Sequence, residues 1–175
     1  GSVSLTGYEI VKLVKASRAC SEMALSAFES YIVEVIAEAV ARRIEKYIFT
    51  GTGTNQPGGV KTAGKGASGA YADGTDQITV GKTASLTEEN VIALYGLLGD
   101  GYERNAVWCM NKATFFSDFF PLMNKSKNNV IEFANGKYYI MGAEVYFTGS
   151  LAAHEAYLGD FSYIIGNYSQ DITVV

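Results

Sequence analysis

The sequence has few of the residues that most often carry chemistry. Its 175 residues include one histidine, His154, and two cysteines, Cys20 and Cys109. The cysteines form no CxxC pair, so we expect neither a metal site nor a disulfide framework, but small buried thiols. His154 and its neighbour Glu155 belong to no H-E-x-x-H or G-x-S-x-G motif, which favours a loop histidine near a turn. We therefore expect no catalytic, cofactor-binding or metal-binding residue, and no cofactor.

Charge is also scarce. Only 18% of the residues are charged, and the net charge is −4. An acidic chain is poorly suited to sequence-independent binding of nucleic acid, which relies on Lys and Arg neutralising phosphates. No run of 18 apolar residues exists, since Glu34, Glu38 and Arg42 interrupt the longest candidate, and no basic-then-apolar leader opens the sequence. We expect a soluble cytosolic chain with no membrane partner.

Apolar and aromatic residues are plentiful. The chain is 48% hydrophobic, with 12 Tyr and 9 Phe, so it can build a core. Tyrosine suits both strands and interfaces, because its ring is apolar and its tip is polar. The composition fits either an ordinary strand-rich domain or a subunit that buries surface against partners, and it does not separate the two.

The longest regular pattern runs from Ser26 to Thr50. It has no internal Gly or Pro, and apolar side chains recur at three- and four-residue steps. Ser26 with Glu29 has the spacing of a capping box, and Gly51 can take the left-handed conformation that closes a helix. The pattern predicts a helix roughly 35 Å long. The stripe is formed by Phe28, Ile32, Val35, Ile36, Ala39, Val40, Ile44, Tyr47 and Ile48.

The opposite face of this predicted helix is charged. Glu38 and Arg42 are four residues apart in the order that favours an ion pair. The face can be solvated, or it can meet opposite charges on another copy, and the sequence favours the solvated reading. Its members are Glu34, Glu38, Arg42, Glu45 and Lys46.

A glycine-rich segment, Gly51 to Asp76, follows and is predicted to be a long loop. Within it, Gly59 to Gly66 nearly matches the phosphate-loop pattern G-x-x-x-x-G-K-[ST], but Gly66 stands where a hydroxyl should bind magnesium. A phosphate loop also follows a buried strand, whereas a helix is expected here. A nucleotide-binding enzyme that uses residues 59–66 is therefore a distant alternative.

Shorter patterns predict the other elements. Thr87 starts a helix from Glu88 to Leu98. Asn111 caps another, Lys112 to Phe120, which Pro121 ends. Polar connections are expected at Lys15–Ser21 and Lys125–Asn129, and a short helical turn at Glu22–Leu25. Strands are expected at Tyr8–Val14, Gln77–Val80, Ala106–Met110, Tyr138–Met141, Ala143–Thr148, Tyr157–Asp160, Tyr163–Ile165 and Ile172–Val175.

Several segments, in this order, resemble the major capsid proteins of tailed phages, which have the Hong Kong 97-type shell fold. Glu144 departs from the pattern, because the family has proline there. The segments are Lys15–Arg18, the predicted helix beginning SAFESYI, the stretch GTGTNQPGG at 51–59, YERNAVWCMN at 102–111, KYYIMGAEVYFT at 137–148 and LGDF at 158–161.

The resemblance implies an α+β fold with a long spine helix and an axial domain of mixed sheet flanked by helices. Residues 1–50 would be part of the peripheral domain with the spine helix, 51–164 the axial domain, and 165–175 the start of a return strand. The family's N-terminal arm, most of its extended loop and its last peripheral pieces have no counterpart here, so we expect a truncated core.

The same resemblance implies a structural subunit of a phage or prophage capsid and no enzyme. The intact protein would form homo-oligomeric pentamers and hexamers, and it would hold packaged DNA only by enclosing it. It would be found in the virion capsid, and in the bacterial cytoplasm during assembly. The alternative of the same fold is the shell of a bacterial nanocompartment, similar to an encapsulin, which encloses protein cargo.

Overall fold

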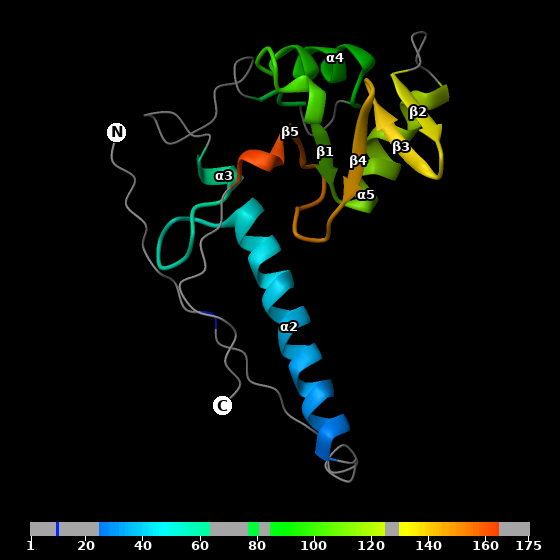
Figure 1. The fold of residues 1–175 in the computed structure, drawn as a ribbon. Helices are drawn as coiled ribbons and strands as arrows, with labels where there is room; N and C mark the ends of the chain where they lie inside the picture. Colours follow the sequence, from blue (N-terminus) through cyan, green and yellow to red (C-terminus); the bar gives the residue numbers. More distant parts are fainter. Residues whose placement is uncertain (1–9, 11–24, 64–76, 81–84, 125–129, 165–175) are drawn as a thin grey trace.

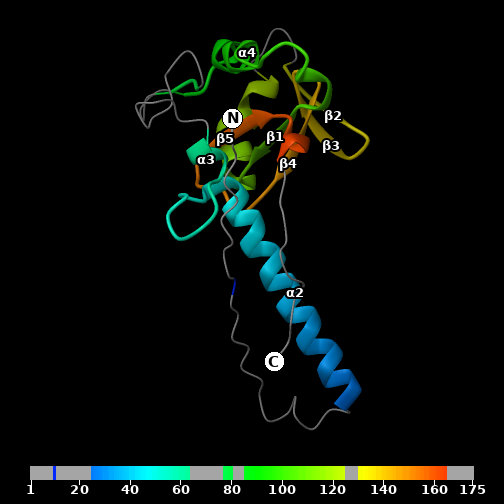
Figure 2. The same cartoon turned by 60° about the vertical axis from the view of Figure 1, so that its left-hand side comes forward.

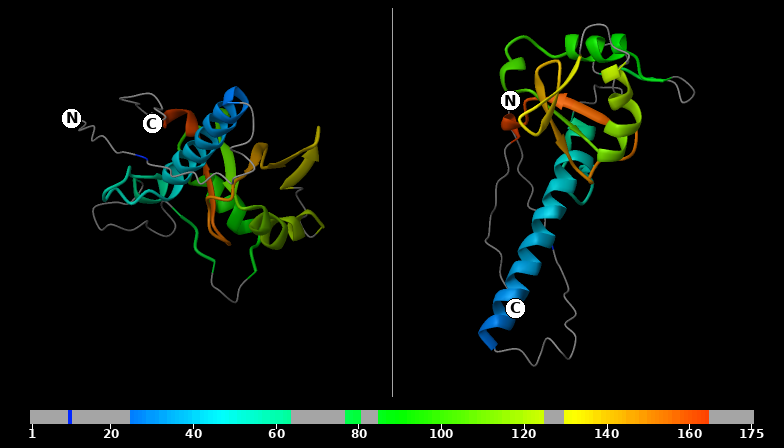
Figure 3. Two further views of the ribbon diagram at one scale, coloured as in Figure 1. Left: turned by 90° about the horizontal axis from the view of Figure 1, so that it is seen from below. Right: turned by 90° about the vertical axis from the view of Figure 1, so that its right-hand side faces the viewer.

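The computed structural model describes residues 10, 25–63, 77–80, 85–124 and 130–164. One long helix leads into a sheet with further helices packed against it (Figure 1). The sheet and its helices lie at the C-terminal end of the long helix when the molecule is turned (Figure 2), and this end-on attachment is also seen from the side (Figure 3). The long helix is therefore a projection from the sheet and not a member of its core.

The long helix α2 spans Leu25–Thr50, so the predicted helix Ser26–Thr50 is confirmed. With 26 residues it is about 39 Å long. From Ala27 to Ile48 none of its residues is buried, and Phe49 in its last turn is the first to be. The apolar stripe of α2 is therefore only partly buried along most of its length. The side chain of Ser26 lies outside the described residues, so its capping box stays a prediction.

The described part of the chain forms a five-stranded mixed sheet in the order β2-β3-β4-β1-β5. β1 runs parallel to β4 and antiparallel to β5, and β2, β3 and β4 form an antiparallel meander. The strands are β1 (Val107–Met110), β2 (Ile131–Ala134), β3 (Lys137–Ile140), β4 (Ala143–Phe147) and β5 (Ala156–Gly159). Four of them were predicted to within two residues of either end.

Strand β2 was missed. Its hairpin with β3 turns at Asn135-Gly136, and the β3–β4 hairpin turns at Met141-Gly142. All four turn residues have positive φ, between 53° and 80°. Such two-residue turns match the twist of the flanking strands, and Asn-Gly is the strongest short signal for them. Asn135-Gly136 was therefore the available signal for β2.

One face of the sheet carries the main core. Trp108 and Ile140 have no exposed surface, and the Trp108 Nε1 donates a hydrogen bond of 3.1 Å to the Ile140 carbonyl oxygen. Helix α4 (Glu88–Gly96) contributes Val91, and the segment after β1 contributes Phe115 and Phe119. Trp108 packs edge-on against Phe119, with ring centroids 5.8 Å apart. This core fixes both helical segments on the same face.

Helix α4 begins as predicted but ends two residues early, at Gly96. Thr87 and Asn90 form a capping box, in which each side chain accepts a hydrogen bond from the other's backbone N–H, at 3.3 and 3.1 Å. The pair satisfies amides that a helix start leaves without partners. The first turn of α4 is therefore stabilised by two residues that are close together in the sequence.

The helix predicted at Lys112–Phe120 is not continuous. The Asn111 cap is confirmed, with its side chain accepting from the Ala113 N–H at 2.8 Å. The chain is then α-helical in α5 (Lys112–Thr114), π-helical in η2 (Phe115–Phe119) and 3-10-helical in η3 (Phe120–Asn124). Pro121 lies inside η3 and does not end the helical segment. Its ring has no N–H to donate, so an α-helical ladder cannot include it, but the chain continues in a tighter turn.

Two predicted strands are wrong. Of Gln77–Val80, Gln77 makes an isolated bridge and the next three residues form no ladder. Of Tyr163–Ile165, Tyr163 belongs to the 3-10 turn η4 (Phe161–Tyr163). The Asp160 side chain accepts a hydrogen bond from the Ser162 N–H at 2.9 Å, which favours a turn over a strand. Another 3-10 turn, η1 (Glu103–Asn105), precedes β1.

Several predictions fall outside the described residues. They concern the strand Tyr8–Val14 except Ile10, the connection Lys15–Ser21, the turn at Glu22–Leu25 up to the start of α2, the loop Lys125–Asn129, and the strand Ile172–Val175. None of the helices in the described ranges is long and apolar enough to cross a membrane.

Replacing Trp108 by phenylalanine tests the core. The change leaves a cavity and removes the donor to the buried Ile140 carbonyl, so we expect a loss of about 2–4 kcal/mol in the free energy of unfolding. Urea denaturation followed by far-UV circular dichroism measures it. Ile92→Ala on the exposed side of α4 is the control and should cost less than about 1 kcal/mol. Equal losses for the two variants would show that Trp108 does not hold the core.

Candidate interaction surfaces

The end of α2 is fixed by close backbone contacts. The Gly51 N–H donates to the Tyr47 carbonyl at 3.0 Å, and the Gly59 N–H donates to the Gly51 carbonyl at 2.9 Å. A Cβ atom on Gly51 would lie 2.1 Å from the Pro57 carbonyl oxygen, and one on Gly59 would lie 2.5 Å from the Tyr47 oxygen. We call this return of the chain onto the last turn of α2 the helix lock, comprising residues 47–59.

The prediction that Gly51 closes the helix in the left-handed conformation is wrong. Positive φ angles occur at Gly53 and Asn55, but Gly51 is not among the residues with positive φ. Glycine is needed there because two backbone segments touch and leave no space for a side chain, not because the helix closes in the left-handed conformation.

In the candidate phosphate loop, Gly59 to Gly66, the described residues 59–63 make contacts within the chain. The Gly59 amide is already bonded to Gly51, and helix α3 (Val60–Ala63) follows at once. Lys61 pairs with Glu155 at 2.5 Å, and Thr62 donates to the Gly51 carbonyl at 2.6 Å. These groups hold the chain together and do not converge on a shared space. Residues 64–66 lie outside the described ranges.

A small apolar cluster joins α2 to the second face of the sheet. Phe49 packs with Cys109, Leu151 and Phe161, and the Phe49 and Phe161 ring centroids lie 5.7 Å apart. One turn earlier, the Glu45 carboxylate accepts a hydrogen bond from the Thr148 hydroxyl. Glu45 was predicted on the charged face of α2, and the structure instead turns it to the sheet.

The ion pair predicted on the charged face of α2 is confirmed. Glu38 and Arg42 form an ion pair of 2.6 Å, with 62% and 76% of their side chains exposed. An exposed pair of this kind contributes little to stability. Apart from Glu45, the surroundings of this face stay as the sequence left them, with solvent and a further copy both open.

Cys109 is a buried thiol, as predicted, whereas Cys20 lies outside the described residues. Burial, and to a smaller extent the charge of Glu45, raise the pKa of the Cys109 thiol to about 11. A thiol with such a pKa is protonated at neutral pH and is a poor nucleophile or metal ligand.

An open groove of about 560 Å³ runs between the end of α2 and the sheet. Its walls are mostly apolar, including Ile48, Val107 and Ile164, and the Glu45 carboxylate is already bonded. A small-molecule site usually has several polar groups that converge on one space. Among the described residues no cluster of three or more His, Cys, Asp or Glu could hold a metal ion.

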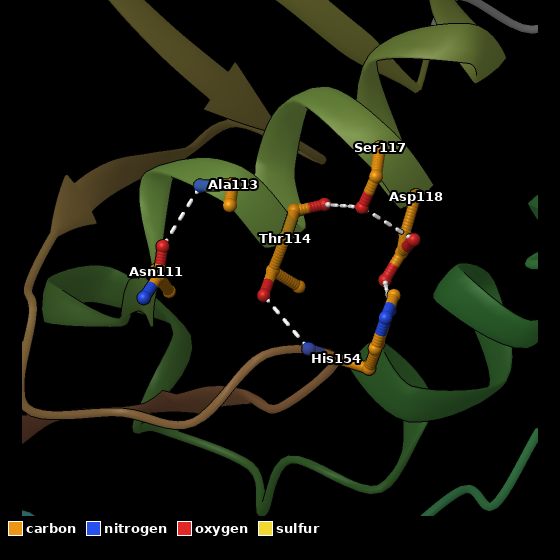
Figure 4. A network of polar contacts seen from close by, with 6 residues as sticks. All are labelled: Asn111, Ala113, Thr114, Ser117, Asp118 and His154. Carbon is orange, nitrogen blue, oxygen red and sulfur yellow. Dashed lines mark hydrogen bonds and ion pairs between the residues drawn. The ribbon is translucent and has the colours of Figure 1, made fainter.

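The single histidine connects the turn before β5 to the helical segment α5–η2 (Figure 4). The His154 backbone N–H donates to the Thr114 hydroxyl at 2.9 Å, and its Nδ1 lies 2.7 Å from Asp118 Oδ2. The Ser117 hydroxyl lies 2.6 Å from the other oxygen of Asp118. A nucleophilic triad needs the imidazole between the hydroxyl and the carboxylate. Here the carboxylate is in the middle, so the arrangement connects chain segments and does not activate Ser117.

The acidic partner of His154 is not its neighbour in the sequence. The His154 imidazole pairs with Asp118, whereas Glu155 pairs with Lys61. Nothing in the local sequence links residues 118 and 154, because only the fold brings them together.

Exposed apolar side chains, most of them aromatic, gather in two places. The first aromatic patch lies over η2, η3 and one end of the sheet, and the second lies beside η1 and η4. The first contains the exposed Phe116, Phe133 and Phe147 with the half-buried Phe120 and Tyr138; the second contains Tyr102 and Tyr163 with Ile164, the next residue in the chain. These two patches and the groove are open, and the stripe of α2 is only partly buried.

The comparisons with known proteins fit this distribution of surfaces. The model of the phage capsid family matches residues 1–175, which is the whole sequence. The chain belongs to the phage capsid family. The predicted family is thereby confirmed.

A solved structure supports the fold. It is described as the capsid of a native GTA particle computed with C5 symmetry, and it matches with 22% identity and a TM-score of 0.51. The match covers 83% of this chain and 53% of that one, so the chain spans about half the length of its structural relative. The predicted α+β class with the Hong Kong 97-type fold is confirmed. A search of curated proteins found no match.

Substitution of single glycines tests the helix lock. Gly59→Ala places a Cβ against backbone that cannot move aside, so we expect a loss of about 2 kcal/mol or more in the free energy of unfolding. The matched control is Gly58→Ala, because a Cβ there meets nothing within 4 Å. The control should change stability by less than about 1 kcal/mol. Thermal denaturation compares them, and equal melting temperatures would contradict the account.

The thiol of Cys109 gives a prediction for pH. In a Cys20→Ser background at pH 8, the raised pKa lowers the thiolate fraction of Cys109 by roughly a hundredfold relative to a free cysteine, and burial slows attack further. A disulfide reagent should therefore react with the folded chain at least a hundredfold more slowly than with the chain in urea. Equal reaction rates of the folded and unfolded chain would contradict the assignment of Cys109 as a buried thiol.

The same pKa shift predicts how stability depends on pH. Because the pKa of Cys109 is raised in the folded state, the stability linked to this proton is complete below pH 9 and declines as the pH rises towards 11.

Proposed function

We propose that this chain is a structural subunit of the icosahedral capsid of a phage or prophage, and that the shell it forms encloses DNA. The observation that carries this proposal is the match of the phage capsid family to all 175 residues. The structural likeness to the capsid of a GTA particle agrees with it at the level of the fold.

The distribution of apolar surface supports the same proposal. Folding normally buries the apolar stripe of a helix, yet the described residues bury α2 only at its last turn. Large exposed apolar patches mark places where a protein meets a partner. A subunit that is covered by copies of itself would account for the stripe and for both aromatic patches at once.

We further propose the division and the partners that the family resemblance implies. Residues 1–50 would belong to a peripheral domain, 51–164 to an axial domain, and 165–175 to the start of a return strand. Copies would associate as pentamers and hexamers, in the bacterial cytoplasm during assembly and then in the virion. The net charge of −4 would let DNA lie inside the shell without binding tightly to it.

The proposal includes the absence of catalysis. The groups nearest to an active site are the helix lock and His154 with its partners, and each has a complete structural explanation in its hydrogen bonds. A nanocompartment shell would share the fold. The family whose model matches the chain is that of phage capsids, so we retain the phage shell.

Fractionation of particles tests the function. Cells that carry the gene are induced, and particles are treated with nuclease and purified by density gradient. Peptides of this chain should be the most abundant in the fraction that retains protected DNA, as measured by mass spectrometry. Peptides confined to particles that contain an enzyme and no DNA would support the nanocompartment instead.

The alternative of a nucleotide-binding enzyme that uses residues 59–66 has a separate test. Calorimetry with ATP or GTP and magnesium should show no binding at millimolar concentration. Tight binding that Lys65→Ala abolishes would contradict the structural role.

A further inference from the structure

The first aromatic patch is a continuous apolar surface. Phe133 and Tyr138 face each other across the β2–β3 hairpin with ring centroids 4.8 Å apart, and Phe116 and Phe147 are stacked at 6.4 Å. The exposed fractions are 41% for Phe116, 57% for Phe133 and 42% for Phe147. Rings that already contact one another expose a single surface whose shape is fixed before any partner arrives.

The second aromatic patch lies at the other edge of the sheet. Tyr102 precedes β1, whereas Tyr163 and Ile164 follow β5, and the two tyrosine rings meet edge-on at 5.3 Å. β2 and β5 are the two edge strands, and Figure 1 shows them on opposite sides. Four strand spacings of about 4.8 Å put the edges about 19 Å apart. One copy therefore presents two unlike apolar surfaces, the first extending from β2 to β4 and the second beyond β5.

The two patches agree in size. Tyr102, Tyr163 and Ile164 are 45%, 69% and 41% exposed. With roughly 200 Å² for a large side chain, each patch exposes apolar area on the order of 300 Å². A stable interface covers about 800 Å² on each partner, with an apolar centre and a polar rim. Each patch is thus large enough to be the centre of one interface.

Charge does not oppose the contact. The first aromatic patch contains no charged side chain. Beside the second, the Asp160 carboxylate accepts from the Ser162 N–H and that of Glu103 from the Gly101 N–H, at 2.9 and 2.7 Å. These carboxylates have hydrogen-bond partners in their own chain, so the apolar surfaces can meet without burying an unpaired charge.

We propose that the first aromatic patch of one copy docks on the second aromatic patch of the next copy. This inference rests on the proposed function and names the surfaces through which subunits would touch. Contact between two unlike surfaces is heterologous, and a heterologous contact closes into a ring when its rotation divides a full turn. A contact of the first patch with itself would end at a dimer and leave the second patch exposed.

Cross-linking between labelled copies tests the pairing. In the 175-residue chain with Cys20→Ser, one preparation carries Phe133→Cys and the other Tyr163→Cys. Cys109 remains, since it is buried and its thiol is protonated. An equal mixture treated with a short bismaleimide should give a covalent dimer that contains one copy of each variant. Neither variant alone should give a dimer.

The control replaces the partner surface. Tyr31 on α2 is 46% exposed and belongs to neither patch, so Tyr31→Cys mixed with Phe133→Cys should give at least tenfold less dimer. A dimer from Phe133→Cys alone would show that the patch meets itself, and it would overturn the proposal. Absence of dimer in the mixture would overturn it as well.

A second measurement does not depend on cross-linker geometry. Phe133→Asp should weaken self-association at least tenfold in sedimentation equilibrium, while Ile92→Asp, outside both patches, should not. Circular dichroism verifies that both variants are folded, and Phe116→Asp replaces Phe133→Asp if the latter unfolds. Equal association of the patch and control variants would overturn the proposal. If the chain is nevertheless found in DNA-containing particles, the proposed function stands and only the docking surfaces are wrong.

Discussion

The structure depends on how the last turn of α2 is held. The backbones of Gly51 and Gly59 touch this turn so closely that no side chain fits between them. Phe49, one residue before the end of the helix, is then held in the apolar cluster against the sheet. A helix of 26 residues that is held at its last turn transmits any rotation of that turn along about 39 Å. Its direction relative to the sheet is therefore set by a few contacts at the helix lock.

This way of attaching α2 separates two kinds of apolar surface. The face of the sheet around Trp108 is closed by α4 and by the helical segments after β1, and it behaves as an ordinary core. The stripe of α2 is only partly buried, and the two aromatic patches are exposed. Apolar surface exposed to water is unfavourable, so burial against a partner would stabilise it. For a chain of the phage capsid family, further copies are the natural covering, and this links the fold to the proposed function.

Local patterns explain which elements the sequence could predict. The period of α2, the apolar run of β1 and the cap at Asn111 each lie within a few residues, and all three were predicted correctly. Errors arose where a local pattern met a competing constraint. Pro121 breaks an α-ladder but is accepted by a 3-10 turn, and Asp160 caps a turn where β-forming residues suggested a strand.

The sequence by itself determined the α+β class, the spine helix and the family, because hydrophobic periodicity and the order of motifs are properties of the chain. Tertiary structure alone decided that Glu45 bonds Thr148, 103 residues away, and that His154 pairs with Asp118, 36 residues away. It also decided that Gly51 is required for close contact and not for its φ angle. Such facts depend on which distant segments fold together, and no local pattern records that.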